Sequence, residues 1–145
     1  MIDVRIQIEL FDSAALLASL QADGVGAISS FTGLVRSDDG VTAIELEHYP
    51  AMTYASLRAV AAEALSRWNL SGAIIVHRVG KMAVGEPIVF VAAASAHRAG
   101  ALAACAFLID RLKTDVPFWK KEFRGADARW VEAKASDDAR AADWD

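Results

Sequence analysis

The chain has little cysteine and no long apolar run, and each shortage excludes a class of protein. Its single cysteine, Cys105, makes an internal disulfide impossible and a cysteine-based zinc site implausible. None of its apolar runs reaches the roughly 18 residues that a membrane-spanning helix needs. The N-terminal residues alternate in polarity, whereas a secretory signal has a basic start followed by an apolar block. We therefore expect a cytoplasmic protein.

Positive charge is also scarce over the chain as a whole. The formal net charge of −4 argues against a general binder of nucleic acids or anionic membranes, because such proteins need a cationic surface. Hydrophobic residues make up 54% of the 145 residues, which is enough for a folded core and excludes a wholly disordered chain. The length predicts a single domain over residues 1–145, with residues 134–145 as a flexible tail.

The pattern of apolar residues predicts a mixture of strands and helices. Alternating apolar residues from Val4 to Leu10 are typical of a half-buried strand. A short helix is expected after Asp12, and longer helices over residues 53–69 and 96–113. Further strands are expected over residues 27–35, 42–48, 73–78, 88–95 and 128–133, with loops over 36–40 and 114–125. This order predicts an α+β fold with a mostly antiparallel sheet and helices packed on one face.

Several common catalytic and binding motifs are missing. There is no glycine-rich loop of the GxxxxGK[ST] or GxGxxG kind, no HExxH and no GxSxG. His48, His77 and His97 lie far apart without an acidic pair at ligand spacing, so neither a metal site nor a cofactor is predicted. Cys105 falls within the apolar stripe of the helix over residues 96–113, which indicates a buried, inert thiol.

Cations are concentrated in one part of the chain, between His97 and Arg124. This stretch holds six lysine or arginine residues against three acidic residues, so its local net charge is +3. The cations either decorate a solvated helix and loop or form a pocket for a small anion. Arg36, which closes an expected strand, is likewise either a solvated strand-end residue or a clamp on a ligand.

His97 and Arg98 follow an expected buried strand and lie in the first turn of the next helix. The N–H groups at a helix N-terminus favour anions, and an arginine there should be paired or ligand-bound. Lys113 lies at the opposite end of the same helix, where a cation is also stable for purely local reasons. The helical rise separates His97 from Lys113 by about 24 Å. Either the two ends serve different ligands, or a second copy brings its His97 and Arg98 to Lys113 in a two-fold dimer.

Two bulky aromatic residues, Phe118 and Trp119, directly precede Lys120 and Lys121. Adjacent aromatic residues in a loop usually pack on a core or on a partner. Such packing would hold Lys120 in place.

Six blocks of residues form a recognisable series along about residues 26–133. They are Phe31-Thr32-Gly33-Leu34-Val35-Arg36, Leu46-Glu47-His48-Tyr49-Pro50-Ala51-Met52, His77-Arg78-Val79-Gly80, Ser95-Ala96-His97-Arg98, Leu112-Lys113-Thr114 through Pro117-Phe118-Trp119-Lys120-Lys121-Glu122, and Trp130-Val131-Glu132. In this order the chain resembles the large (catalytic) subunits of molybdopterin synthases.

The resemblance implies an α/β hammerhead fold and a sulfur transferase of molybdenum cofactor biosynthesis. Such subunits form a homodimer within a heterotetramer, in which each copy binds a small ubiquitin-like sulfur carrier. The carrier's C-terminal Gly-Gly thiocarboxylate enters the active site. Two sulfurs then pass to cyclic pyranopterin monophosphate, whose cyclic phosphate opens as the dithiolene of molybdopterin forms.

The resemblance also implies roles for individual residues. Lys113 and Lys120 match the catalytic lysines of the family, and both also contact substrate. Arg36, His97 and Arg98 match its contacts to the substrate anion. Further substrate-binding positions are Lys121, Glu122 and the pocket-lining Phe31.

Two other functions are open on the residues alone. The chain could be a non-catalytic protein-binding module that docks through its aromatic residues and acidic tail. It could also be an enzyme that acts on another small phosphate ester through the same cations. A neighbouring ubiquitin-like protein of about 80 residues that ends in Gly-Gly would favour the synthase.

Overall fold

The computed structural model describes the backbone of residues 1–131 and 135–145, and the side chains of residues 1–131 and 139–145. The fold is α+β, as predicted, with two sheets and four α-helices in the described chain. In chain order the elements are β1 (Ile2–Gln7), α1 (Ser13–Ser19), β2 (Ala27–Leu34), the 3-10 turn η1 (Asp38–Gly40), β3 (Ala43–His48), α2 (Pro50–Trp68), β4 (Gly72–Arg78), β5 (Gly80–Ala83), β6 (Pro87–Ser95), α3 (Arg98–Asp115), β7 (Phe118–Arg124), β8 (Asp127–Val131) and α4 (Ala135–Ala142). None of the helices within the described residues is long and apolar enough to cross a membrane.

The first sheet has the strand order β1-β4-β6-β2. β1 pairs with β4 in parallel, whereas the β4–β6 and β6–β2 pairs are antiparallel. Every residue of β4 is buried, and so is most of β6, because helices cover both faces of these central strands. Their nearly continuous apolar sequences explain why both strands are predictable from the sequence.

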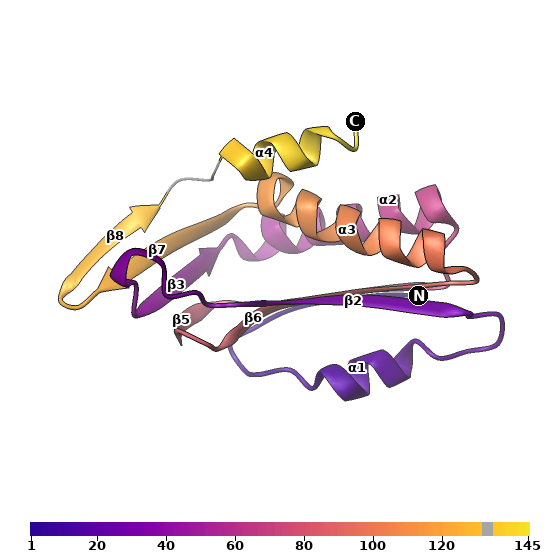
Figure 1. The fold of residues 1–145 in the computed structure, drawn as a ribbon, viewed down its shortest axis with the longest axis horizontal. Helices are drawn as coiled ribbons and strands as arrows, with labels where there is room; N and C mark the ends of the chain where they lie inside the picture. The colour runs from indigo at the N-terminus through magenta and orange to yellow at the C-terminus, as the bar shows by residue number, and fades with distance from the viewer. Residues whose placement is uncertain (132–134) are drawn as a thin grey trace.

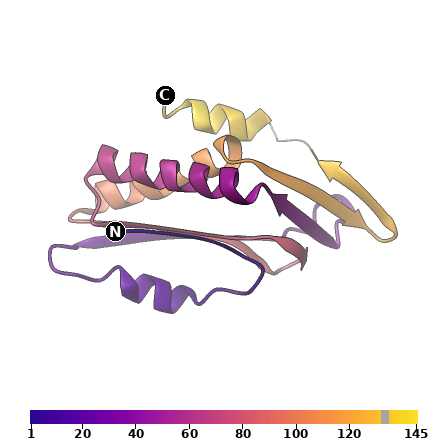
Figure 2. The ribbon, with the colours of Figure 1, turned by 180° about the vertical axis from the view of Figure 1, so that it is seen from behind.

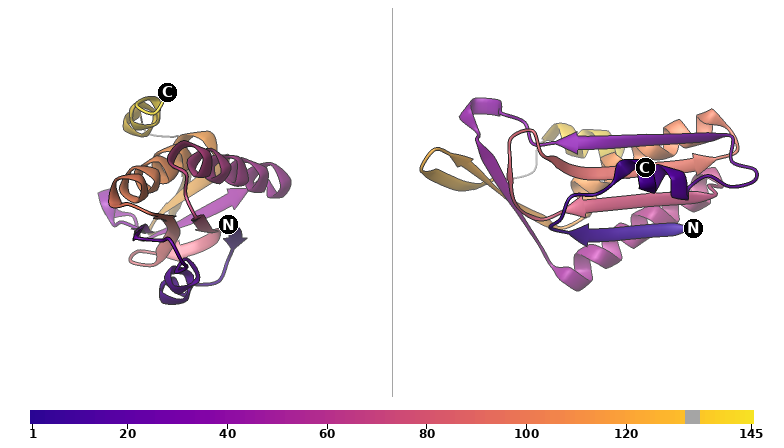
Figure 3. Two further views of the ribbon diagram at one scale, coloured as in Figure 1. Left: turned by 90° about the vertical axis from the view of Figure 1, so that its right-hand side faces the viewer. Right: turned by 90° about the horizontal axis from the view of Figure 1, so that it is seen from below.

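Helices lie on both faces of this sheet. The long helices α2 and α3 cover one face, where Leu57 and Leu108 pack on Ile75 and Val91. Their position agrees with the prediction of helices on one face, but the short α1 lies on the opposite face (Figures 1 and 2). The end-on view in Figure 3 shows α4 as a further layer, outside α2 and α3.

The second sheet projects from one end of the first (Figures 1 and 3). Its strand order is β5-β3-β7-β8, with every neighbouring pair antiparallel. Only Val79 separates β4 from β5, and Gly80 follows with φ of +86°, a backbone region that favours glycine. The chain therefore passes almost directly from the first sheet into the second at this point. Val35, Val41, Ile44, Leu46 and Met82 form a small core beneath the second sheet.

The prediction of a loop over residues 114–125 is wrong, because β7 occupies Phe118–Arg124. Alternation along β7 places Phe118, Lys120 and Glu122 on one face of the strand, with Trp119 and Lys121 on the other. The charged residues in the middle of this segment concealed a strand that is only partly buried. The short strand β5 was not predicted either.

The other elements lie close to their predicted positions. Asp12 caps α1, since its side chain accepts a hydrogen bond from the Ala15 N–H at 3.1 Å. α2 begins at Pro50 rather than residue 53, because proline is well suited to the first helical position. Residues 132 and 133 of the last expected strand lie outside the described residues, as does residue 134 of the expected tail. Beyond them the chain forms α4, and the flexibility expected of this tail stays a prediction.

Candidate functional site

Helix α3 divides the candidate residues into two groups at its opposite ends. It runs without a break from Arg98 to Asp115, so Arg98 and Lys113 lie about 22 Å apart along its axis. Sheet pairing gives the same division, since Ala27 pairs with Ser95 near the start of α3 and Leu34 pairs with Pro87 near its end. One chain therefore cannot bring both ends of α3 to one small molecule.

Lys113 lies in the last turn of α3 and is exposed. Its positive charge acts on the ring of His77 from β4, which lies on the face of the first sheet that α3 covers. The His77 ring stacks on Phe118, with centroids 4.0 Å apart and an interplanar angle of 22°. Lys113 therefore lies next to the point where β7 begins.

Lys120 and Glu122 form an ion pair on the same face of β7 as Phe118. The Lys120 Nζ lies 3.4 Å from a Glu122 carboxylate oxygen, and the Arg124 guanidinium lies 3.0 Å from the other oxygen. The Glu122 side chain is only 16% exposed, whereas that of Lys120 is 39% exposed. Glu122 is thus held between two cations, and the Lys120 ammonium remains open to solvent and to a ligand.

Lys121 lies on the opposite face of β7 from Lys120. Its ammonium lies 5.3 Å from the centroid of Trp130 and 5.8 Å from that of Phe123. On the same sheet, an open groove of about 440 Å³ is lined by Glu47, His48, Tyr49, Trp119 and Trp130. The structure thus separates Lys121 from Lys120, although the two are adjacent in sequence.

The end of β2 brings Arg36 to the same end of the molecule as Lys113, whereas Phe31 lies midway along β2. Phe31 pairs with Val91, lies on the face of the first sheet that α3 covers, and is 40% exposed. Arg36 follows β2, and its guanidinium forms an ion pair with Asp38 in the exposed turn η1. Arg36, Lys113, Lys120 and Glu122 therefore belong to one end of the fold, and Phe31 lies between this end and the start of α3.

His97 and Arg98 form the second group, at the start of α3. Both are exposed. His97 is the N-cap residue with extended backbone angles (φ −131°, ψ 152°), so its predicted place in the first helical turn is wrong, and Arg98 is the first helical residue. The His97 N–H donates to the Ser95 hydroxyl at 3.4 Å. This turn presents both side chains at the helix N-terminus, where an anion is favoured.

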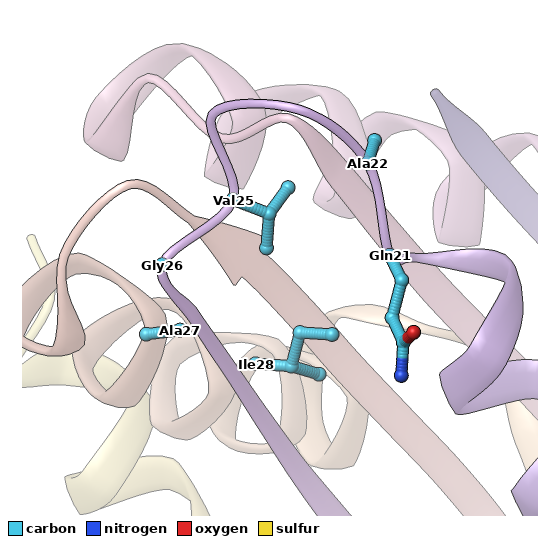
Figure 4. Close-up of a pocket in the computed structure, with 6 residues that line it drawn as sticks. All are labelled: Gln21, Ala22, Val25, Gly26, Ala27 and Ile28. Carbon is cyan, nitrogen blue, oxygen red and sulfur yellow. The ribbon is translucent and has the colours of Figure 1, made fainter.

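Gly26 allows β2 to begin directly against this turn. Its N–H donates to the Ser95 carbonyl at 3.0 Å, and a Cβ atom built on Gly26 would lie 2.2 Å from the Ala96 carbonyl oxygen. Gly26 also lines a pocket of about 370 Å³ with Gln21, Ala22, Val25, Ala27 and Ile28 (Figure 4). Gln21 is the only polar side chain among these six lining residues, so this pocket is poorly suited to an anion.

Two titratable groups in the interior, His77 and Cys105, favour their neutral forms. Burial, opposed by the hydrogen bond to the Arg78 carbonyl and reinforced by the nearby charge of Lys113, lowers the pKa of His77 to about 3. The His77 Nδ1 lies 2.8 Å from the Arg78 carbonyl oxygen, and Nδ1 carries the proton because a carbonyl only accepts. Cys105 is buried, as predicted, and burial raises the pKa of its thiol. Within the described residues no cluster of His, Cys, Asp and Glu could hold a metal ion.

From the sequence alone, His77 had no role beyond its place in one of the six blocks, and Thr53 was missed entirely. Thr53 is a fully buried polar residue within the apolar face of α2. Its only signal in the sequence is a hydroxyl where the helical stripe calls for an apolar side chain. Lys113 and Lys120 are cations that can bind anions and stabilise negative charge that develops in a reaction.

Comparisons with known proteins agree on one family. A family model described as MoaE protein matches residues 6–115. The chain is 52% identical to the molybdopterin synthase catalytic subunit of Mesorhizobium japonicum, over 97% of this chain and 92% of that protein. The solved structure of the molybdopterin biosynthesis MoaE protein from Burkholderia ambifaria matches with a TM-score of 0.86 at 46% identity, covering 99% of this chain and 98% of that one.

A more distant structure shares the fold. It is a complex of subunits 1 and 2 of the molybdopterin-converting factor from Helicobacter pylori. The TM-score is 0.72 at 19% identity, over 92% of this chain and 91% of that one.

Proposed function

This chain belongs to the MoaE protein family, and on that premise we propose that it is the catalytic subunit of a molybdopterin synthase. It transfers two sulfurs from the thiocarboxylated C-terminus of a small carrier subunit to cyclic pyranopterin monophosphate, and molybdopterin is the product. We also propose that residues 1–145 work as one domain in the cytoplasm.

The observation that carries the proposal is a cationic end of the fold without a reactive sulfur of its own. Lys113 lies in the last turn of α3, and Lys120 lies near the start of β7, the next strand. The only cysteine, in contrast, is buried, and its pKa is raised. A buried thiol is a poor nucleophile, because the thiolate is the reactive form. The transferred sulfur therefore comes from outside, on an anionic carrier, to a substrate that is itself an anion.

The two lysines have separate roles in this proposal. Lys113 binds the thiocarboxylate next to the substrate carbon that receives the sulfur. As the sulfur attacks, a phosphate oxygen leaves with its electron pair, and Lys120 stabilises that charge or donates a proton to it. Glu122 orients Lys120 through their 3.4 Å ion pair.

The opposite end of α3 completes the site of a second copy. His97 and Arg98 lie too far from Lys113 to share a small substrate within one chain. We assign them to the phosphate of the substrate bound at the partner's Lys113, in a two-fold dimer that binds two carriers. The Helicobacter pylori complex of two subunits supports a heteromeric assembly for this fold.

Replacing Lys113 tests the catalytic assignment. In an assay reconstituted with thiocarboxylated carrier and cyclic pyranopterin monophosphate, Lys113→Ala should reduce product formation by at least about 100-fold, the scale of one lost electrostatic stabiliser. The matched control is Arg58→Ala, which removes an exposed cation from α2 and should leave turnover unchanged. Gel filtration should show an intact dimer for both. Near-normal turnover of Lys113→Ala would rule out the assignment.

Mixed dimers test the shared site. A chain with Lys113→Ala and a chain with Arg98→Ala should each be inactive alone. If each site combines Lys113 of one copy with Arg98 of the other, a heterodimer of the two variants regains one intact site. A mixture that stays as inactive as either variant would contradict the shared site.

A further inference from the structure

The segment between Lys113 and Lys120 is clamped at its midpoint by two buried side chains from other elements. We propose that Thr53 of α2 and His77 of β4 are positioning residues that fix the distance and direction between the two catalytic lysines. This inference rests on the proposed function and adds two residues to it. Neither residue is a catalytic residue in this proposal, because neither needs to touch the substrate.

Thr53 holds the turn that connects α3 to β7. Its hydroxyl donates to the Pro117 carbonyl oxygen at 2.8 Å and accepts a hydrogen bond from the Tyr49 N–H at 3.0 Å. The side chain is fully buried, so water cannot replace either bond. Pro117 lies between Lys113 and Lys120, and its position is therefore tied to the first turn of α2, 64 residues earlier in the chain.

His77 holds Phe118, the residue after Pro117, in position. Its ring stacks on Phe118, and its Nδ1–H donates to the Arg78 carbonyl, which fixes the plane of the ring. The ring is buried and stays neutral because burial lowers its pKa to about 3. Phe118 and Lys120 are two residues apart on one strand, so they share a face of β7. The orientation of the His77 ring therefore fixes the position of Phe118, which is the first residue on the face of β7 that carries Lys120.

The two clamps act on adjacent residues, Pro117 and Phe118. Val116, just before them, is buried and has already left the helical conformation, so α3 no longer fixes the chain at this point. Without the clamps, the direction of β7 relative to α3 would depend on the strand pairing of β7 with β3 and β8. A displacement of about 1 Å at the reacting groups can cost about 100-fold in rate, so clamps of this kind matter for turnover.

The test uses pairs of variants at each clamp in the full chain, assembled with the carrier. Thr53→Val keeps the shape of the side chain and removes the hydroxyl, whereas Thr53→Ser keeps the hydroxyl. We expect kcat to fall about 10- to 100-fold in Thr53→Val with KM changed less than about threefold, and Thr53→Ser to stay within about twofold of the parent. If Thr53→Val leaves kcat unchanged, or if Thr53→Ser is equally impaired, the hydroxyl does not position the lysines.

The second pair separates stacking from simple burial, and it applies even if Thr53→Val does not fold. His77→Phe keeps a flat ring against Phe118, whereas His77→Leu keeps apolar bulk without the ring. We expect His77→Phe to retain at least about threefold more of the parent kcat than His77→Leu. Equal kcat values for the two variants would overturn the role of the ring.

A readout without substrate separates this inference from the proposed function. The ¹³Cε resonances of Lys113 and Lys120 should shift in Thr53→Val and stay in place in Thr53→Ser, while that of Lys81 stays constant in both. Unmoved Lys113 and Lys120 resonances in Thr53→Val would overturn the positioning role, whatever the assay gives. Shifted resonances in a chain whose unsubstituted form makes no product would instead refute the proposed function and leave the clamps in place.

Discussion

The pH dependence of stability should reveal the buried His77 directly. In the unfolded chain a histidine binds a proton near its ordinary pKa of 6.5, whereas in the folded chain the pKa of His77 is about 3. Between these values the unfolded state binds more protons than the folded state, so the free energy of unfolding falls as the pH falls. Above pH 6.5 His77 is neutral in both states, so it no longer lowers the free energy of unfolding.

The size of the effect follows from the gap between the two pKa values. Each pH unit within that gap is worth about 1.4 kcal/mol. Lowering the pH from 7.5 to 4.5 should therefore remove about 2 to 3 kcal/mol from the free energy of unfolding through His77 alone. This is a large fraction of the about 5–15 kcal/mol that stabilises a typical domain.

The assay compares the parent chain with His77→Phe by urea unfolding at both pH values. The phenylalanine cannot titrate, but it loses the hydrogen bond to the Arg78 carbonyl, which costs about 1 kcal/mol at pH 7.5. At pH 4.5 the order should reverse, with His77→Phe the more stable by about 1 to 2 kcal/mol. Carboxylates titrate alike in both chains, so their contribution cancels in the difference.

An exposed histidine provides the control. His97→Gln should follow the parent chain at both pH values, because His97 is exposed. Parallel losses of stability in the parent and His77→Phe between pH 7.5 and 4.5 would refute the account of a buried, neutral His77.

Two further predictions concern stability. Gly26→Ala should destabilise the fold by at least about 1–3 kcal/mol in denaturant melts, because its Cβ would lie 2.2 Å from the Ala96 carbonyl oxygen; an unchanged melt would contradict that close approach. Asp110, which is buried in α3, accepts a hydrogen bond from the Trp144 indole N–H at 2.8 Å. In a double-mutant cycle, Asp110→Leu and Trp144→Phe should show a coupling energy of about 1 kcal/mol, and strictly additive effects would mean that this bond adds nothing to stability.

The central strands and long helices could be predicted because each carries its own signal. β4 and β6 are apolar almost throughout, and Leu57, Val60, Ala61 and Ala64 of α2 form the buried stripe that their spacing predicts. The stripe predicted for α3 is less accurate. Helical spacing puts Leu102 in the same stripe as Cys105, yet Leu102 is 61% exposed, whereas Phe107, which lies outside the stripe, is fully buried.

The second sheet and the clamps could not be predicted in the same way. β7 is short, half-buried and rich in charge, and its strand conformation depends on pairing with β3 and β8. Thr53 and His77 meet Pro117 and Phe118 only after segments far apart in the sequence have packed together. The separation of His97 from Lys113, in contrast, follows from helix geometry and was predictable.

The length of α3 has a consequence for the proposed dimer. If each end of this helix belongs to a different active site, the length of the helix fixes the distance between two phosphate-binding sites. Inserting one residue would lengthen it by about 1.5 Å and turn one end against the other by about 100°. The length of 18 residues would then matter for activity as much as the identity of a catalytic lysine does.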